Sequence, residues 1–237
     1  MSKGLIFRSK THEKVMQLIA EYGYITSKEV GLITPNPHII LHYMKTKKII
    51  TTFPTHLNPT LAYTLTPQAK RIISSGGLVD SINHFTPGNY KETMFYHSTA
   101  LIKLQLIFEQ ILGPRLKKYI SGIRLQKNLQ NKKVCDAEII YTKDNKDKTL
   151  AVELELSRKW KQRFLRIVRN LTEQAKGKYN IVIIIYSITS LKENWQKALK
   201  DLDTHGVPYF FIQYSDFIQN RQLCKVEDIN NKVIPLF

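Results

Sequence analysis

Cysteine and long apolar segments are scarce in this chain. Of its 237 residues only two are cysteines, Cys135 and Cys224, which are too few for a zinc site and fit a reducing compartment. No apolar run approaches the roughly 20 residues that a membrane helix needs, and the N-terminal stretch MSKGLIFRSK lacks the apolar core of a signal peptide. We therefore expect a cytoplasmic protein that does not insert into a membrane.

Acidic residues are also few relative to basic ones. The chain carries 36 Lys and Arg residues against 19 Asp and Glu residues, which gives a formal net charge of +17 and a pI of about 9.8. This excess favours a polyanionic partner, with nucleic acid as the first candidate and an anionic membrane surface as the second. A solvated, lysine-rich surface is the alternative. The hydrophobic content of 43% suffices for the core of one large domain or two small ones.

Several common catalytic motifs are missing as well. The chain has no Gly-rich phosphate loop, no GxSxG sequence and no CxxC sequence. The sequence therefore gives little support to a P-loop nucleotide hydrolase, a serine hydrolase with a nucleophile elbow or a dithiol oxidoreductase.

Residues 1–75 have the pattern of three helices followed by two strands and a short fourth helix. Apolar residues recur at helical spacing in THEKVMQLIAEYG and TPNPHIILHYMKTKK, whereas KIITTF and LAYTLT have the composition of strands. This order resembles the winged-helix family, whose third helix enters the major groove of DNA. The resemblance makes the following residues candidate DNA contacts, although each could be an ordinary exposed polar residue: Asn36, His38, His42, Lys45, Lys47, Lys48 and, on the wing, His56.

A stretch rich in Gly, Ser and Asn, residues 76–93, predicts a linker, and residues 94–237 predict a second domain. The second domain has the order helix, two acid-bearing strands, a long basic helix, strand, helix, strand. In the basic helix, RKWKQRFLRIVRNLTEQAK, the spacing predicts that Trp160, Phe164 and Ile167 face inward. We expect an α/β sandwich with a mixed sheet, and for the whole chain an α+β or α/β fold.

Acidic residues alternate with apolar ones in the two strands VCDAEIIY and TLAVELELSRK. Side chains two residues apart lie on one face of a strand, so Asp136 and Glu138 share a face, as do Glu153 and Glu155. In a hairpin these carboxylates converge, which is costly unless a cation compensates their charge. An all-oxygen site of this kind suits a hard divalent cation such as Mg²⁺.

The layout and the acids together resemble the PD-(D/E)xK nuclease core. Cys135-Asp136 stands where the family has Pro-Asp, and Glu153-Leu154-Glu155 where it has Glu-x-Lys, so the Lys of the motif is missing and Lys159 follows one turn later. The stretch VELELSRK is similar to winged-helix proteins of the replication-relaxation type and to MOBC-class plasmid relaxases.

The resemblance implies phosphodiester cleavage that depends on Mg²⁺ or Mn²⁺. Asp136 and Glu153 would be metal ligands, with Glu155 as a third ligand or a base that orients water, and Lys159 would stabilise the developing oxyanion. Two further candidates, both also compatible with a packing role, lie in the preceding helix: Glu109 as an outer acid and His97 as the counterpart of a family histidine.

The corresponding function is DNA nicking at an origin of transfer during plasmid or conjugative-element mobilisation, with double-stranded DNA and other relaxosome or coupling proteins as partners. The basic helix offers candidate phosphate contacts in Arg158, Lys161, Arg163 and Arg166, or else a solvated face. The acids could equally form a structural ion-pair network. Two alternative functions stay open: a non-catalytic DNA-binding replication or transcription regulator with a decayed nuclease fold, and a restriction- or transposon-type endonuclease.

A covalent tyrosine–DNA intermediate is not suggested by the sequence. The relaxases that use one surround their metal with closely spaced histidines, and this chain has no such cluster. We expect Tyr141, Tyr179 and Tyr186 to be packing residues.

Overall fold

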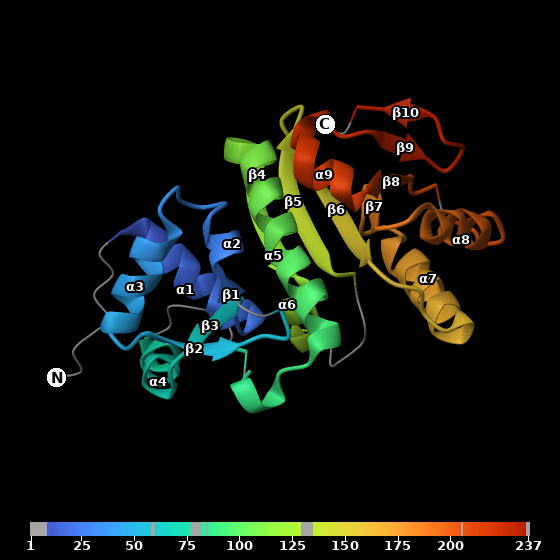
Figure 1. Ribbon diagram of the computed structural model, residues 1–237. Helices are drawn as coiled ribbons and strands as arrows, with labels where there is room; N and C mark the ends of the chain where they lie inside the picture. Colours follow the sequence, from blue (N-terminus) through green and yellow to red (C-terminus); the bar gives the residue numbers. More distant parts are fainter. Residues whose placement is uncertain are drawn as a thin grey trace. The chain divides into compact units, whose positions relative to one another are not determined.

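The computed structural model describes residues 9–57, 60–76, 82–83, 85–128, 135–204 and 206–235. The chain divides into two compact units, Met1–Leu106 and Ile107–Phe237, and each is described by itself (Figure 1). Their boundary lies within helix α5 (Glu92–Leu112). Among the described residues, no helix combines the length and the apolar character that crossing a membrane requires.

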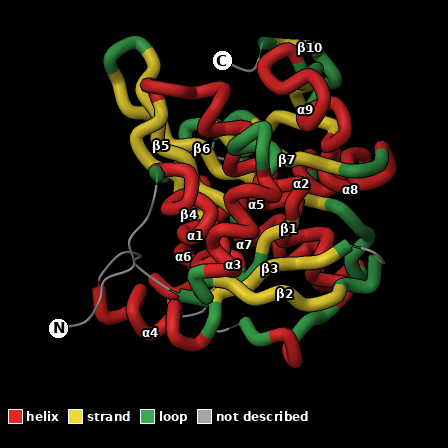
Figure 2. Tube along the Cα trace, turned by 60° about the vertical axis from the view of Figure 1, so that its left-hand side comes forward, coloured by secondary structure: helices red, strands yellow, loops and turns green. Residues whose placement is uncertain are grey.

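The first unit consists of helices around a small antiparallel sheet with the strand order β1-β3-β2. Figure 2 shows β2 and β3 running side by side. Its elements before α5 are α1 (Lys10–Tyr22), β1 (Ile25–Thr26), α2 (Ser27–Val30), α3 (Pro37–Thr46), β2 (Ile50–Pro54), β3 (Leu61–Leu65), α4 (Pro67–Gly76) and the 3₁₀ turn η1 (Pro87–Asn89).

Local sequence signals fix where these helices begin and end. Helix α2 starts with a capping box, in which the Thr26 hydroxyl accepts a hydrogen bond from the Lys28 N–H and the Glu29 carboxylate accepts one from the Thr26 N–H. Pro37 occupies the start of α3, where its fixed φ suits a helix. Gly23 ends α1 with a φ of +92°, and a Cβ there would lie 2.6 Å from the Phe85 Cβ, so a glycine is required.

An aromatic cluster ties the described part of residues 76–93 to the first unit. Phe85 and Tyr90 pack against Tyr24, Phe53 and Phe95, with ring-centroid distances of 4.9 Å for Tyr24–Phe85 and 5.3 Å for Phe53–Phe85. Phe85 and Tyr90 therefore pack within the first unit.

The second unit contains a seven-stranded mixed sheet with the order β10-β9-β8-β7-β6-β5-β4. Strands β6, β7 and β8 are parallel, and the remaining neighbours pair antiparallel. This confirms the predicted combination of helices with a mixed sheet. After α5 the elements are η2 (Gly113–Arg115), β4 (Leu116–Ser121), α6 (Gly122–Asn128), β5 (Ala137–Lys143), β6 (Lys146–Glu155), α7 (Lys161–Ala175), β7 (Ile181–Tyr186), α8 (Thr189–Lys200), β8 (Tyr209–Gln213), α9 (Tyr214–Asn220), η3 (Arg221–Leu223), β9 (Val226–Asp228) and β10 (Val233–Ile234).

The hairpin of β5 and β6 closes through a tighter turn than the polar stretch TKDNKDK suggested. Only Asp144 and Asn145 lie between the strands, and both have positive φ, 52° and 57°. Positive φ at both central residues is the geometry of a type I′ turn, in which Asn and Asp are favoured. The polar residues on either side extend the two strands instead of forming the loop.

The core of the second unit lies between the sheet and helices α7 and α8, which pack against each other (Figure 1). Val182 and Ile184 of β7, Val168 of α7 and Trp195 of α8 are all fully buried there. Trp160, which helical spacing had placed in this core, is 88% exposed. The prediction was wrong because α7 begins only at Lys161, so the periodicity of the helix does not govern Trp160.

Replacement of Ile184 by Ala should strongly destabilise the second unit. Ile184 is 0% exposed in the central strand β7, and truncating such a side chain leaves a cavity that costs about 2–5 kcal/mol. The matched control is Leu223→Ala, because Leu223 is 84% exposed and its truncation should change stability by less than about 0.5 kcal/mol. Urea unfolding measures both. Equal stability of the two variants would contradict the assigned core.

Candidate functional site

Asp136 and Glu153 lie across from each other at one end of the β5–β6 ladder. The last pair of the ladder on this side is Ala137 with Val152, so the next position places Asp136 opposite Glu153. The Asp136 carboxylate accepts a hydrogen bond of 2.8 Å from the Leu154 N–H. The Asp136 side chain thereby supplies a hydrogen-bond acceptor for a backbone N–H of β6 at a position where β5 no longer pairs with β6.

The glutamates of both strands lie on the face of the sheet that α7 and α8 cover. Ala151 belongs to the core on this face, and the two-residue period of a strand places Glu153 and Glu155 on the same face. Glu138 pairs with Ala151 across the ladder and shares that face. Glu138, Glu153 and Glu155 are only 7%, 1% and 1% exposed.

Lys159 compensates the charge of Glu155. Its ammonium group lies 2.6 Å from each of the two carboxylate oxygens of Glu155, and the Lys159 side chain is 15% exposed. Lys159 belongs to the segment between β6 and α7, and it reaches back to the end of the strand. The structure thus brings the ammonium group of Lys159 to Glu155, one of the predicted site acids.

A second cluster beside Asp136 was not predicted from the sequence. Lys178 forms an ion pair of 2.6 Å with Glu138, the Tyr179 hydroxyl donates to Glu138 at 3.2 Å, and the Cys135 thiol lies 3.6 Å from the same hydroxyl. Lys178 and Tyr179 come directly before β7. Only the parallel pairing of β6 with β7 brings them to β5, so no local sequence signal could have found them.

Burial favours the protonated, neutral forms of the Cys135 thiol and the Tyr179 hydroxyl in this cluster. Desolvation, together with the nearby carboxylates, raises the pKa of Cys135 to about 12. Burial also raises the pKa of Tyr141, Tyr179 and Tyr186, and these side chains are 1%, 4% and 8% exposed. A buried, neutral phenol is a poor nucleophile toward a phosphate. The three tyrosines are packing residues, and Tyr179 also donates a hydrogen bond to Glu138.

The carboxylate oxygens at the end of β6 are of the ligand type that a hard divalent cation prefers. Asp136 and Glu153 are the residues that would hold such an ion. Glu155 already shares its charge with Lys159. Within the described part of the chain, no three His, Cys, Asp or Glu side chains gather closely enough to form a metal site by themselves.

The two outer candidates lie on α5 but in different units. His97 is half-buried in the part of α5 that belongs to the first unit, and Glu109 is half-buried in the part that belongs to the second. Both side chains have interaction partners.

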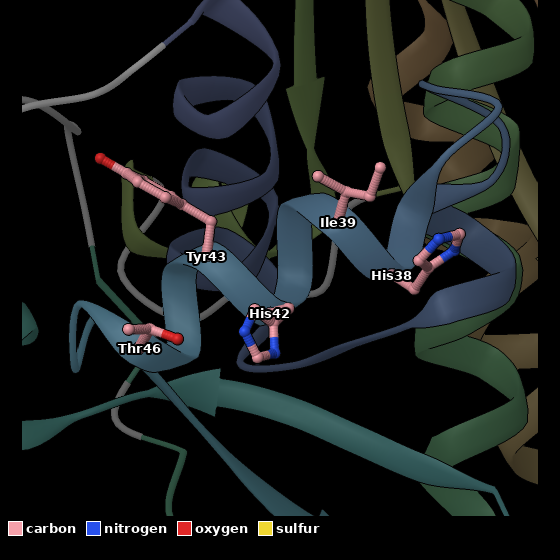
Figure 3. A pocket seen from close by; sticks show the side chains of 5 residues that line it. All are labelled: His38, Ile39, His42, Tyr43 and Thr46. Atoms are coloured by element: carbon pink, nitrogen blue, oxygen red, sulfur yellow. The ribbon is translucent and has the colours of Figure 1, made fainter.

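Helix α3 presents an open depression of about 530 Å³ on the first unit. Figure 3 shows its lining residues along the helix, with His42 and Thr46 on one side and Ile39 and Tyr43 on another. Ile39 is 57% exposed. The candidate contacts Asn36, His38, Lys45, Lys47 and Lys48 are all exposed, on α3 or next to its ends.

His56, in contrast, belongs to the interior of the first unit. Its ring lies 5.3 Å from Phe95 and 5.2 Å from Tyr96, hydrogen-bonds to the Tyr90 hydroxyl, and its side chain is 16% exposed. The expected role as a wing contact does not agree with this packing, because the loop after β2 turns His56 toward the aromatic cluster.

The basic residues around the start of α7 are exposed. Arg158, Lys161, Arg163 and Arg166 all project into solvent, and Arg158 donates to the Ser190 hydroxyl at 3.4 Å. They lie on and next to the segment that carries Lys159. Exposed positive charge therefore lies close to Lys159 along the chain.

Replacing Lys159 by Met should destabilise the second unit by about 3–5 kcal/mol, because Glu155 would remain buried without its cation. The double variant Glu155→Leu/Lys159→Met should recover most of this loss, since it removes both charges. Lys161→Met, at an exposed position two residues further on, is the control. Denaturant unfolding gives the comparison, and a cost of less than about 1 kcal/mol for Lys159→Met would contradict a buried ion pair.

The two thiols should be unreactive in the native protein. Burial raises the pKa of both Cys135 and Cys224 to about 12, so the thiolate fraction at pH 8 is on the order of 10⁻⁴ and grows only as the pH approaches 12. Iodoacetamide at pH 8 should modify the unfolded chain at least about a hundredfold faster than the native one. Rapid modification of native Cys135 would show that the cluster beside Asp136 is open to solvent.

No protein-family model matches this chain, and neither a curated protein nor a solved structure shows significant similarity to it.

Proposed function

We propose that this protein is a metal-dependent DNA-nicking relaxase that acts at an origin of transfer during plasmid or conjugative-element mobilisation. The observation that carries the proposal is the placement of Asp136 opposite Glu153, with the Glu155–Lys159 ion pair at the end of the same strand. Acids and a lysine in this arrangement are the parts that metal-assisted phosphodiester cleavage requires.

The order of elements supports a PD-(D/E)xK nuclease fold for the second unit. Helix α5, strands β4, β5 and β6, helix α7 and strand β7 follow one another, with the acids on the β5–β6 hairpin as in that family. In the first unit, the order of α1, α2 and α3 before the antiparallel β2–β3 pair supports a winged helix.

The side chains of the second unit would have distinct roles in cleavage. Asp136 and Glu153 would bind Mg²⁺ or Mn²⁺; when bound, the ion lowers the pKa of a water molecule and stabilises negative charge on the scissile phosphate. Lys159 would donate hydrogen bonds to the developing oxyanion. Glu155 would be a positioning residue, because both of its oxygens hold the Lys159 ammonium group in place.

The remaining basic residues would bind the DNA. Arg158, Lys161, Arg163 and Arg166 would contact phosphates close to the cleavage site, which gives affinity without sequence selection. The exposed side chains of α3 would enter the major groove of the double-stranded origin and select the site. Other relaxosome or coupling proteins would then be partners at the same DNA.

Replacing Asp136 by Ala or Glu153 by Gln should abolish nicking of a supercoiled plasmid that carries the cognate origin. Either change removes a carboxylate that the cation needs, whereas the exposed basic residues stay in place. Agarose gels with Mg²⁺ or Mn²⁺ measure nicked circles. The matched control is Glu173→Gln, an isosteric change at an exposed position of α7, which should nick like the parent protein.

Binding to the same DNA, measured without metal, should be nearly unchanged in Asp136→Ala and should weaken steeply with salt as counterions are released. A parent protein that leaves the plasmid supercoiled with either metal would overturn the proposed activity. Linear product in place of nicked circles would point to a restriction- or transposon-type endonuclease.

One observation favours a second candidate, a DNA-binding replication or transcription regulator that has lost catalysis. Glu155 stands where the nuclease motif has its lysine, and Lys159 neutralises it within the folded chain. Calorimetry with Mn²⁺ separates the two functions. Uptake that Asp136→Ala eliminates agrees with the nuclease, whereas no uptake by the parent protein agrees with the regulator.

A further inference from the structure

Trp160 exposes almost its whole side chain to solvent. Its exposed fraction is 88%, whereas the other tryptophan of the chain, Trp195, is 0% exposed. Tryptophan is highly buried on average, and its side chain combines a large apolar body with a polar N–H that suits binding surfaces. The exposure of Trp160 leaves both faces of an indole accessible to a ligand.

The backbone under Trp160 is held in place by the neighbouring strand. The Ser187 N–H donates to the Glu155 carbonyl at 3.1 Å, and the Ser187 hydroxyl donates to the Leu156 carbonyl at 2.9 Å. On the other side of Trp160, its own carbonyl accepts the Phe164 N–H of α7 at 2.9 Å. These bonds place the indole on a supported segment at the carboxyl end of the parallel strands β6 and β7.

The surroundings of the indole are positively charged. Arg158, Lys161 and Arg163 are exposed within three residues of it, and the first turn of α7 has no acidic residue. Lys159, its direct neighbour, reaches the Glu155 carboxylate. An aromatic ring among cations is the combination by which proteins bind single-stranded nucleic acids, with bases stacked on the ring and phosphates paired with Lys and Arg.

The exposed indole also indicates whether the bound nucleic acid is single-stranded or double-stranded. In a duplex the faces of each base are covered by the neighbouring base pairs, so a side chain reaches them only after the base has left the stack. The cations alone would hold duplex and single strands alike, whereas the exposed indole adds affinity only for an unpaired base.

We propose that Trp160 stacks on an unpaired base of single-stranded DNA beside the scissile phosphate, while Arg158 and Lys161 bind the flanking phosphates. This inference rests on the proposed function and specifies its substrate: the origin would be cut in a segment whose strands have separated.

Tryptophan fluorescence tests this site without cleavage. The full-length chain carrying Asp136→Ala is titrated with oligothymidylate in the absence of metal, and Trp160 should be quenched and shielded from acrylamide. Adding Trp160→Phe should remove the fluorescence change but keep most of the affinity, because phenylalanine can still stack. Adding Trp160→Ala should weaken binding of fluorescein-labelled oligothymidylate about tenfold and change duplex binding less than about twofold.

The control variant is Val233→Ala, which truncates another exposed apolar side chain, 55% exposed, on strand β10. It should bind oligothymidylate like its parent. Unchanged binding by the Trp160→Ala variant, or equal quenching by a duplex, would overturn the inference. Since the assay requires no cleavage, loss of the stacking signal in a protein that nicks refutes only this inference, and a stacking signal in a protein that never nicks refutes only the nuclease proposal.

Discussion

Compensation of buried negative charge is the constraint on which the second unit depends. Glu138 and Glu155 lie on the covered face of the sheet, and a carboxylate taken out of water costs several kcal/mol unless a cation pairs with it. Lys159 supplies one cation from the segment before α7, and Lys178 supplies another from the segment after it. The ion pairs Lys159–Glu155 and Lys178–Glu138 therefore connect the segments at both ends of α7 to the sheet.

Acidic and basic side chains differ in how often they are buried in the described part of the chain. Most buried charged side chains of the described chain are acidic, namely Glu29, Glu138, Glu153, Glu155 and Glu227, whereas Lys192 is the basic one. The surface is consequently more basic than the net charge of +17 alone conveys. In the function proposed above, this basic surface would attract DNA from a distance, and the acids of β5 and β6 would hold a cation at one phosphate.

Much of the fold followed from local patterns, because alternation and helical spacing are properties of adjacent residues. The acids of the β5–β6 hairpin and the alternation of helices and strands in the second unit were visible in the sequence. Errors arose where a pattern was extended past the end of an element. Trp160 fits the spacing of α7 but precedes the helix, and the contacts of Phe85 with Tyr24 and Phe53 join segments that are far apart in the sequence.

The sequence by itself determined the charge balance, because that depends only on composition. It also determined the change from a mostly helical first part to a mixed second part, and the placement of two acids on the same face of one strand. Both depend only on residues a few positions apart. Tertiary structure alone decided which cation neutralises each acid, which histidine is covered by aromatic rings and which tryptophan meets solvent. Those outcomes depend on contacts between segments brought together by strand pairing, such as Lys178 with Glu138, and no local spacing encodes them.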